Sequence, residues 1–278
     1  MRFPERLSVL ALLVAIAAPL QASAGAESVR NEIVSRIRAQ YPSLAPTDLA
    51  SGSAAFDPVR QADAQRNKPA PGAAEAIEAG RRIWMRKFAN GRSLTGCFPN
   101  GGRRIAASYP QVDRRMKRLV TLETAINQCL KTHGQPLLDA GDPDSMGVVL
   151  AYLRSLSDGQ KISVRVASAQ DEERFEEGRR LYFTRMGQQN YACASCHLNH
   201  AGKFFGDTAI PSPVGSAVQW PHLREGRPVT LQMRVRECLD RMGAAAFPAG
   251  SDELAHLDYF LSYLSNGLPI RPNAWRPR

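Results

Sequence analysis

An internal repeat limits the possible folds of this chain more than any other feature of its sequence. Three blocks occur twice and in the same order: EAGRRIW (78–84) with EEGRRLY (176–182), TLETAINQCL (121–130) with TLQMRVRECL (230–239), and LAY (150–152) with LDY (257–259). Repetition of whole blocks in one order indicates two homologous domains. Apolar residues recur at helical spacing in and around these blocks, and strand-like alternation is scarce. We therefore predict a mainly α chain built from two tandem domains.

The repeat and the proline- and glycine-rich breaks set the predicted domain boundaries. We expect one domain over residues 65–160 and a second over 165–278, with an N-terminal helix and an extended lead-in over 25–64. The run 161–166 is a minor candidate for a strand. Helical periodicity predicts further helices at 116–130, 146–156, 174–183 and 254–264.

The first 24 residues have the three parts of a secretory signal peptide. Arg2 and Arg6 supply a positive start, an apolar run extends from Leu7 to Leu20, and the small residues ASA at 22–24 form a cleavage site. The apolar run is too short for a stable membrane span, and no later stretch is apolar enough to cross a bilayer. We therefore expect export to the periplasm, an oxidising compartment in which cysteines are paired or bound to a cofactor.

The charge of the chain narrows the class of partners. The formal net charge is +10, which suits an acidic protein partner or an anionic substrate. Basicity that serves only solubility is an equal alternative. Because the basic residues are dispersed along an exported chain, nucleic acid is a poor candidate.

The cysteines carry the clearest chemical signal. They are Cys97, Cys129, Cys193, Cys196 and Cys238, an odd number, so at least one needs a role other than a disulfide. Residues 193–197 read CASCH, the CxxCH motif, whose thiols add to the two vinyl groups of haem and whose histidine binds the iron. The sequence lacks both the second ligand pair of a zinc site and the α/β pattern of a thioredoxin-like redox pair. We predict one covalent haem c on Cys193 and Cys196, with His197 as proximal ligand.

The surroundings of this motif match a small helical cytochrome c domain. Gly178 and Tyr182 lie one helical turn apart, just before the motif. A small residue there would let a C-terminal helix, expected at Leu257–Leu264, approach closely. The second domain is therefore predicted to hold the haem.

The first domain has lost the residues that attach haem. Cys97 in TGCF occupies the position of Cys196 in ASCH, but Phe98 follows it in place of a histidine, and Leu94 stands where the first haem cysteine would stand. Cys97 and Cys129 would lie on either side of the missing haem. Without haem, these two cysteines come within reach of each other, and we predict a Cys97–Cys129 disulfide.

Candidates for the second axial ligand lie between the haem motif and the last helix. They are His222, Met233, Met242 and Cys238. Methionine would give an ordinary electron-transfer cytochrome. The repeat favours the cysteine, because the first domain has Cys129 at the position of Cys238 and no methionine at the other two positions. We therefore predict Cys238 as the distal ligand, held as a thiolate by the iron and nearby guanidinium groups, and His222 as a packing or propionate-contacting residue.

Arg234 lies four residues before Cys238, so a helix would place both on one face. A guanidinium beside a sulfur site suits an oxyanion, which it binds through two charge-assisted hydrogen bonds. Two interpretations are open. Arg234 binds the substrate, which we favour, or it pairs only with a haem propionate or an acidic surface group. Arg236, two residues away from Cys238, should point elsewhere.

These features together resemble the SoxA family, the catalytic cytochrome subunits of the SoxAX complex of bacterial thiosulfate oxidation. The signal peptide, the two related domains, CxxCH in the second and RVREC about forty residues later carry the resemblance, which spans nearly the whole mature chain. CxxCH alone is shared with many cytochromes, whereas the repeat combined with RVREC is far more specific. Many SoxA proteins carry two haems. This chain has GCFPN in the first domain and is similar to the single-haem type with a disulfide there.

The resemblance also implies an activity and partners. The family acts as an L-cysteine S-thiosulfotransferase, which joins thiosulfate oxidatively to a cysteine of a SoxYZ-like carrier protein and passes electrons through haem to a cytochrome c. It implies a heterodimer with a SoxX-like mono-haem cytochrome c, a persulfide on the catalytic Cys238, and Arg234 as the thiosulfate-binding residue. Two alternatives are a methionine-ligated electron-transfer cytochrome c without sulfur-transfer activity and a haem-based sensor of a sulfur oxyanion.

Overall fold

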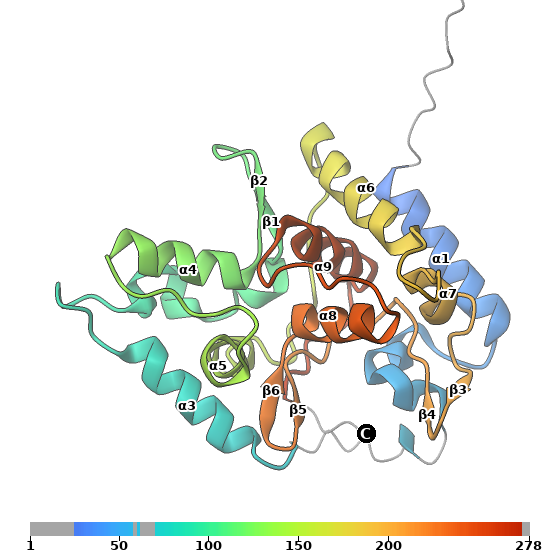
Figure 1. Cartoon of the computed structure of the whole chain (residues 1–278), viewed down its shortest axis with the longest axis horizontal. Coiled ribbons are helices and arrows are strands. Elements are labelled where there is room, and N and C mark those ends of the chain that lie inside the picture. The colour runs from blue at the N-terminus through green and yellow to red at the C-terminus, as the bar shows by residue number, and fades with distance from the viewer. Residues whose placement is uncertain (1–24, 58–59, 62–69, 274–278) are drawn as a thin grey trace, which may run out of the picture.

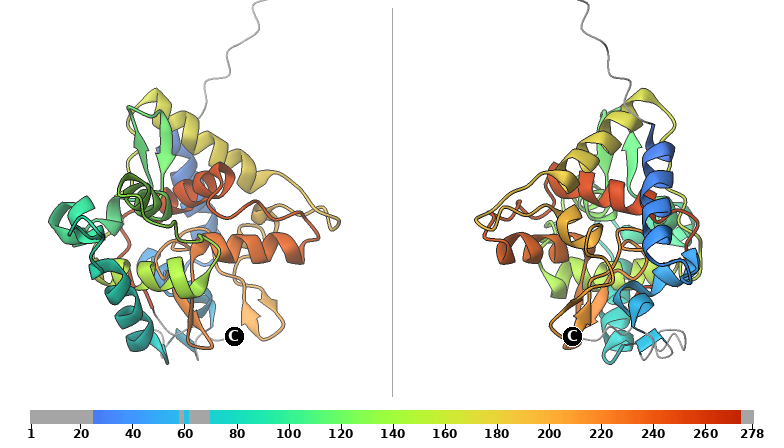
Figure 2. Two further views of the ribbon diagram at one scale, coloured as in Figure 1. Left: turned by 60° about the vertical axis from the view of Figure 1, so that its left-hand side comes forward. Right: turned by 90° about the vertical axis from the view of Figure 1, so that its right-hand side faces the viewer.

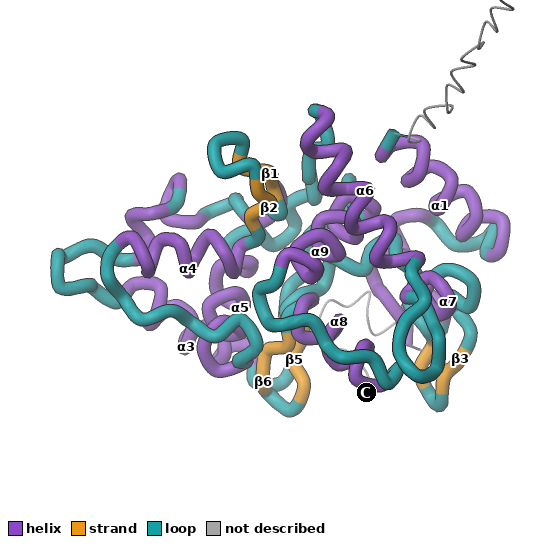
Figure 3. Tube along the Cα trace, turned by 45° about the horizontal axis from the view of Figure 1, so that its top comes forward, coloured by secondary structure: helices purple, strands orange, loops and turns teal. Residues whose placement is uncertain are grey.

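The computed structural model describes residues 25–57, 60–61 and 70–273, and the predicted signal peptide at 1–24 lies outside this part of the chain. About half of the described chain is helical, and its strands form small two-stranded antiparallel sheets (Figure 3). The prediction of a mainly α fold is therefore confirmed. Among the described residues, no helix is both long and apolar enough to cross a membrane.

The elements follow one another along the chain as follows. The helical elements before residue 160 are α1 (Ala26–Gln40), η1 (Pro46–Phe56), α3 (Ala73–Met85), η2 (Leu94–Cys97), η3 (Pro99–Gly102), η4 (Ala106–Ser108), α4 (Leu122–Thr132), the π-helical turn η5 (Pro143–Gly147) and α5 (Val148–Ser155). Those after it are α6 (Ala169–Phe183), α7 (Cys193–His197), α8 (Leu231–Arg241) and α9 (Asp252–Leu264). The strand pairs are β1 (Gln111–Asp113) with β2 (Arg118–Val120), β3 (Phe204–Phe205) with β4 (Thr208–Ala209), and β5 (His222–Arg224) with β6 (Arg227–Val229).

In the first half, helices α3 and α5 pack against each other at a glycine (Figure 1). A Cβ atom on Gly80 would lie 1.9 Å from the carbonyl oxygen of Val148, so the two helices approach this closely only because residue 80 has no side chain. One turn further along α3, the fully buried Trp84 ring lies 5.0 Å from the ring of Phe98, centroid to centroid.

The second half repeats this device with α6 and α9. A Cβ atom on Gly178 would lie 2.2 Å from the carbonyl oxygen of His256, so the predicted close approach at Gly178 is confirmed. The rings of Phe175 and Tyr182 on α6 each lie 5.2 Å from the ring of Phe260 on α9. The close packing of α6 against α9 is the central helix–helix contact of the second half.

The N-terminal helix α1 packs on the second half, although the first half follows it in the chain (Figures 1 and 2). The Ala26 N–H donates to a carboxylate oxygen of Glu172 on α6 at 3.1 Å. The Tyr41 hydroxyl donates to the carbonyl oxygen of Ala201, beyond α7, at 2.6 Å. The lead-in therefore braces the segment that carries the CxxCH motif.

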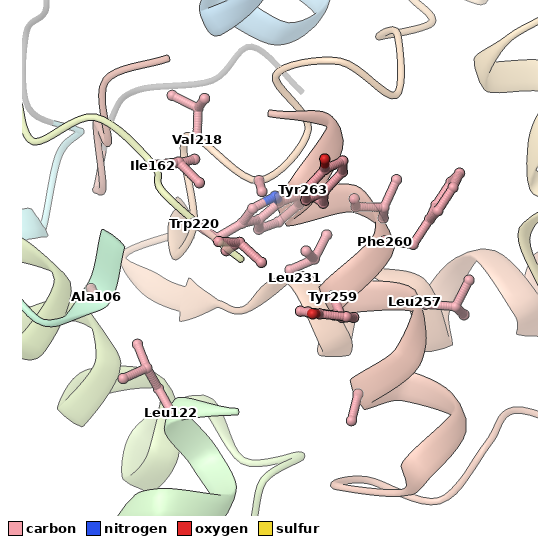
Figure 4. Close-up of a cluster of buried hydrophobic side chains, with 14 of the residues drawn as sticks. Ala106, Leu122, Ile162, Val218, Trp220, Leu231, Leu257, Tyr259, Phe260 and Tyr263 are labelled. Atoms are coloured by element: carbon pink, nitrogen blue, oxygen red, sulfur yellow. The ribbon is translucent and has the colours of Figure 1, made fainter. Parts of the chain in front are cut away.

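The two halves share one apolar core. A single cluster of buried residues contains Leu122 of α4 together with Trp220, Tyr259 and Phe260 from the second half (Figure 4). The chain also returns to the first half at its end, where the Asn273 side chain donates to the carbonyl oxygen of Ala151 at 3.0 Å. The halves are therefore packed as one body, and the predicted boundaries at 65–160 and 165–278 stay a prediction.

Two local predictions are wrong. The helix predicted over 116–130 begins only at Leu122, because residues 118–120 pair with β1 in a hairpin and the Thr121 hydroxyl caps the N-terminus of α4. The run 161–166 is not a strand: only Lys161 forms an isolated bridge, to Pro269. A hairpin with residues 111–113 decides the first structure, and the second segment forms a bridge with distant Pro269 at one residue only; apolar periodicity reports neither pairing.

Candidate functional site

The CxxCH motif forms the short helix α7. Its first turn is closed by the Ala192 N–H, which donates to the Ser195 hydroxyl at 3.1 Å. Cys193 and Cys196 are three residues apart on this helix and therefore lie on one face. Both are free thiols and half-buried. The helix thus presents two unpaired thiols on one side, followed directly by the imidazole of His197.

His197 is oriented by a backbone carbonyl. Its Nδ1 lies 2.9 Å from the carbonyl oxygen of Pro211, so Nδ1–H is the donor and Nε2 is the nitrogen left for another partner. The side chain of Cys238 lies close enough to His197 for the two groups to interact. Two residues 41 positions apart in the sequence therefore meet side chain to side chain.

Cys238 reaches His197 from helix α8. The Thr230 hydroxyl caps this helix by accepting the Met233 N–H at 3.2 Å. Burial raises the pKa of the Cys238 thiol, but the interaction with His197 and the charges of Arg234 and Arg241 outweigh burial and hold the pKa below its ordinary value. Cys238 is therefore the most readily ionised of the free thiols that the structure describes, because the other two have raised pKa values.

The residues of this site fit a c-type haem. Burial, with a contribution from the neighbouring Cys238, raises the pKa of Cys193 to about 12, so this thiol is neutral and unpaired. The buried Tyr182 hydroxyl beside Cys193 and Cys196 has no hydrogen-bond partner among the described residues. An orphaned polar atom, two free thiols on one helix face, and an imidazole facing a third sulfur form a donor set suited to that group.

The other predicted ligand candidates have different surroundings. Met233 is buried, and its sulfur accepts the Thr230 N–H at 3.4 Å, so it serves the cap of α8. Met242 caps the other end of that helix. His222 is buried, with its ring 4.5 Å from the ring of Trp220. The predicted packing role of His222 therefore agrees with its place in the core.

Arg234 takes part in an ion-pair network. Its Nη1 donates to Glu237 Oε2 at 3.0 Å. Glu237 also accepts two hydrogen bonds from Arg224 of β5, each at 2.9 Å. Burial raises the pKa of Glu237, but the hydrogen bonds and charges of Arg224 and Arg234 outweigh burial and lower it. Arg234 therefore pairs with an acidic group, as one of the two interpretations requires, and its charge also acts on Cys238.

Sequence reasoning missed three charged residues near Cys238: Arg224 and Glu237 of this network, and Arg241, whose charge acts on the thiol. The spacing of Arg234 and Glu237 on one helix, three residues apart, was a usable signal. So was Arg241, three residues after Cys238. No sequence pattern near Arg224 indicates its role. It lies 13 residues before Glu237, and only the β5–β6 hairpin brings it to α8. Arg236 points elsewhere, as predicted, and donates to the carbonyl oxygen of Phe247.

The first half holds a disulfide where the second half holds Cys196 and Cys238. Cys97 and Cys129 are bonded, with their Cα atoms 6.1 Å apart. A ring nitrogen of His133 lies within 4.8 Å of both sulfurs, and this group is the one set of possible metal ligands among the described residues. Because the sulfurs are bonded to each other, they are not thiolate ligands. The predicted cysteine pairing is present in the structure.

Comparison with known proteins supplies the family. A family model described as SoxA/TsdA, cytochrome c domain, matches residues 79–162 and 177–270. The L-cysteine S-thiosulfotransferase subunit SoxA of Chlorobaculum tepidum is 32% identical over 86% of this chain and 84% of its own length. That of Allochromatium vinosum is 34% identical over 83% of each chain. A crystal structure of SoxXA from P. pantotrophus matches with a TM-score of 0.65 and 25% identity, covering 72% of this chain and 76% of that one. The chain therefore belongs to the SoxA/TsdA cytochrome c family.

Proposed function

We propose that this chain is the SoxA-like subunit of an L-cysteine S-thiosulfotransferase, which conjugates thiosulfate oxidatively to a cysteine of a SoxYZ-like carrier protein. The observation that carries the proposal is Cys238. It is a free thiol with a lowered pKa that faces His197 and is flanked by Arg234, in a chain whose relatives bear the name of that enzyme. An ordinary electron-transfer cytochrome has no need of such a thiol.

One haem c is part of the proposal: Cys193 and Cys196 would attach it, and His197 and Cys238 would bind its iron. When bound, it supplies a one-electron acceptor that passes electrons on to a cytochrome c. A single haem is supported by the first half, where the buried side chains of Leu94 and Phe98 stand at the positions of ligating residues.

The domain organisation, the cellular location and the partner subunit are also part of the proposal. The repeated blocks and the double match of one family model support two tandem cytochrome c-like domains related by duplication, at 65–160 and 165–278. The signal sequence at 1–24 supports export to the periplasm. The structural likeness to SoxXA supports a SoxX-like mono-haem cytochrome as the partner in a heterodimer.

The chemistry of the residues follows from their charges. Arg234 holds the sulfonate end of thiosulfate through the donors that Glu237 leaves free. The Cys238 thiolate bonds to the sulfane sulfur of thiosulfate, and two electrons leave. The carrier thiolate then attacks that sulfane sulfur, the bond to Cys238 breaks, and Cys238 is restored as a thiolate. In sum, a thiol and thiosulfate give an S–S bond, one proton and two electrons. A persulfide on Cys238 would place the reacting sulfur one atom further out.

Turnover by the haem-loaded heterodimer tests this proposal, with thiosulfate, the carrier protein and cytochrome c, whose reduction is followed by absorbance. Cys238→Ser should abolish cytochrome c reduction and leave haem attachment intact, because Cys193 and Cys196 are untouched. Undiminished turnover by Cys238→Ser would refute the assigned role. Cys238→Ser should also change the low-temperature electron paramagnetic resonance spectrum of the haem. If a methionine were the ligand in place of Cys238, this substitution would leave the spectrum unaltered.

A further inference from the structure

Glu237 joins two arginines that come from different parts of the fold. Its Oε1 accepts Arg224 Nη1, and its Oε2 accepts both Arg224 Nη2 and Arg234 Nη1, at 2.9–3.0 Å. Arg224 lies on β5, whereas Arg234 and Glu237 lie on α8. One carboxylate therefore connects the β5–β6 hairpin to the helix that carries Cys238.

The geometry of this bridge leaves most of Arg234 available. A guanidinium has five N–H donors in a fixed plane, and the structure gives only one of these, on Nη1, to Glu237. The side chains of Arg234 and Glu237 are 31% and 33% exposed, so their network is accessible to a small anion. Holding one edge of the guanidinium fixes the direction in which its other donors point.

An ordinary surface ion pair in the same hairpin provides a contrast. Arg227 of β6, opposite Arg224 in the register, pairs with Asp144 at 2.7 Å. Both side chains are more than half exposed, at 57% and 65%. Exposed pairs of this kind contribute little, because water screens the charges. The Glu237 bridge is more buried and joins three charged groups, and the charge of one of them, Arg234, acts on the Cys238 thiol.

We infer that Glu237 is a positioning residue for the sulfur-oxyanion substrate: anchored on Arg224, it fixes the Arg234 guanidinium so that its remaining donors meet the sulfonate beside Cys238. This inference rests on the proposed function. It deepens that function by assigning substrate orientation to a carboxylate, a group that by charge alone would repel an anion. Arg224 acts as the anchor of the bridge, and its link to Arg234 runs through Glu237.

Positioning and charge predict opposite results for the same substitution. Glu237→Gln keeps the size of the side chain but replaces one acceptor oxygen with a donor that faces the guanidinium groups. If Glu237 positions Arg234, the dissociation constant for thiosulfate and the KM rise about tenfold, and kcat changes far less. If Glu237 acts only by repelling anions, removal of its charge tightens binding. Glu237→Asp keeps the charge but shortens the reach, so positioning predicts weaker binding for this variant too.

Calorimetric titration of the haem-loaded heterodimer with thiosulfate alone, without the carrier, tests the inference beside steady-state turnover. Asp144→Asn is the matched control, because it removes a carboxylate from the neighbouring Arg227 and leaves the Glu237 bridge untouched. Thermal melting reports whether each variant is folded. We expect weaker binding in both Glu237 variants and wild-type binding in Asp144→Asn.

The outcomes separate this inference from the proposed function. Binding as tight as wild type, or tighter, in Glu237→Gln overturns the positioning role, whatever the turnover. A wild-type protein that binds thiosulfate but never turns over refutes the transferase function, while the ratio of dissociation constants still decides the role of Glu237. Absence of thiosulfate binding by the wild-type protein overturns the inference as well, because a preformed anion site is what it asserts.

Discussion

The buried Glu123 and the half-buried Asp258 come from different halves of the chain and line one cavity, and they predict how the stability of this protein depends on pH. Glu123 lies in the first turn of α4 and Asp258 on α9, and both line the cavity together with Arg154 of α5. The Arg154 guanidinium donates to the carbonyl oxygens of Trp220 at 2.5 Å and Ala217 at 2.9 Å. Its hydrogen bonds thus hold the second half in place, and its charge acts on the carboxyl groups through space.

The pKa of Asp258 is raised from 3.8 to about 7, first by burial and then by the charge of Glu123. Burial raises the pKa of Glu123 as well. The hydrogen bond from Ser262 and the charge of Arg154 oppose the rise at Asp258 without cancelling it. The folded protein therefore holds a proton on this pair under conditions in which the unfolded chain has released it.

The sign of the effect follows from this proton. Well below pH 3.8, Asp258 is protonated in both states and imposes no penalty on folding. Between pH 4 and pH 7, the unfolded chain ionises first, so the free energy of unfolding falls as pH rises. The pKa lies about three above 3.8, and at about 1.4 kcal/mol per pH unit the loss reaches at most about 4 kcal/mol by pH 8.

Asp258→Asn removes this dependence. The amide keeps the size of the side chain and an oxygen that can accept the Ser262 hydroxyl, which donates to Asp258 at 3.0 Å. We expect the stability of Asp258→Asn, relative to wild type, to increase from pH 4 to pH 8 by up to about 4 kcal/mol. Urea unfolding of the haem-loaded protein, followed by circular dichroism across this range, measures the difference. Asp252→Asn, at an exposed position of the same helix, is the control.

Parallel pH profiles for wild type and Asp258→Asn would refute this reasoning, because the folded state would then bind no extra proton at that position. Glu123→Gln supplies an independent check. Since the charge of Glu123 contributes to the raised pKa of Asp258, its removal should flatten the wild-type profile only in part. A profile in Glu123→Gln as steep as that of wild type would mean that burial acts alone.

Two further predictions concern the frame of the fold. Gly178→Ala places a Cβ atom 2.2 Å from the carbonyl oxygen of His256, so α6 and α9 must separate; we expect a loss of more than about 3 kcal/mol in unfolding free energy, and a melting temperature equal to wild type would contradict the packing described above. Cys97→Ser opens the Cys97–Cys129 disulfide, which spans 32 residues, and should cost about 3–4 kcal/mol in denaturant unfolding while haem absorbance stays unchanged. Loss of the haem spectrum in folded Cys97→Ser would show that the halves depend on each other more than their packing indicates.

The sequence alone predicted the parts of this molecule that depend on chemistry at short range or on the repeat. The CASCH motif predicts a covalently bound haem, because two thiols and an imidazole at that spacing have few other functions in proteins. Gly178 was predictable because a small residue on an otherwise large helix face marks a close approach. The pairing of Cys97 with Cys129 followed from the comparison of the two halves, which acts as an alignment of the chain with itself.

What could not be predicted depends on how distant segments pack. Helix α1 precedes the first half in the chain, yet it packs on α6 of the second half through its buried face. Residues 118–120 read as part of a helix until pairing with β1 is known. Arg224 has no sequence relation to Arg234, and only the hairpin brings it to Glu237. The periodicity of apolar residues indicates which face of an element is buried, but it does not identify the segment against which that face packs.

The proposed duplication also explains how one fold holds a disulfide-bonded cysteine in its first half and a free thiol at the equivalent position of its second half. Cys129 and Cys238 occupy equivalent positions, on α4 and α8. In the first half, the residues four before and three after the cysteine are Ala125 and Thr132, which are neutral, and the sulfur is closed into a disulfide. In the second half, both flanking positions are arginines whose charges lower the pKa of the free thiol. The two halves therefore differ both in the state of the sulfur, which is bonded in one and free in the other, and in the charges beside it, and the proposed reactivity of Cys238 rests on both differences.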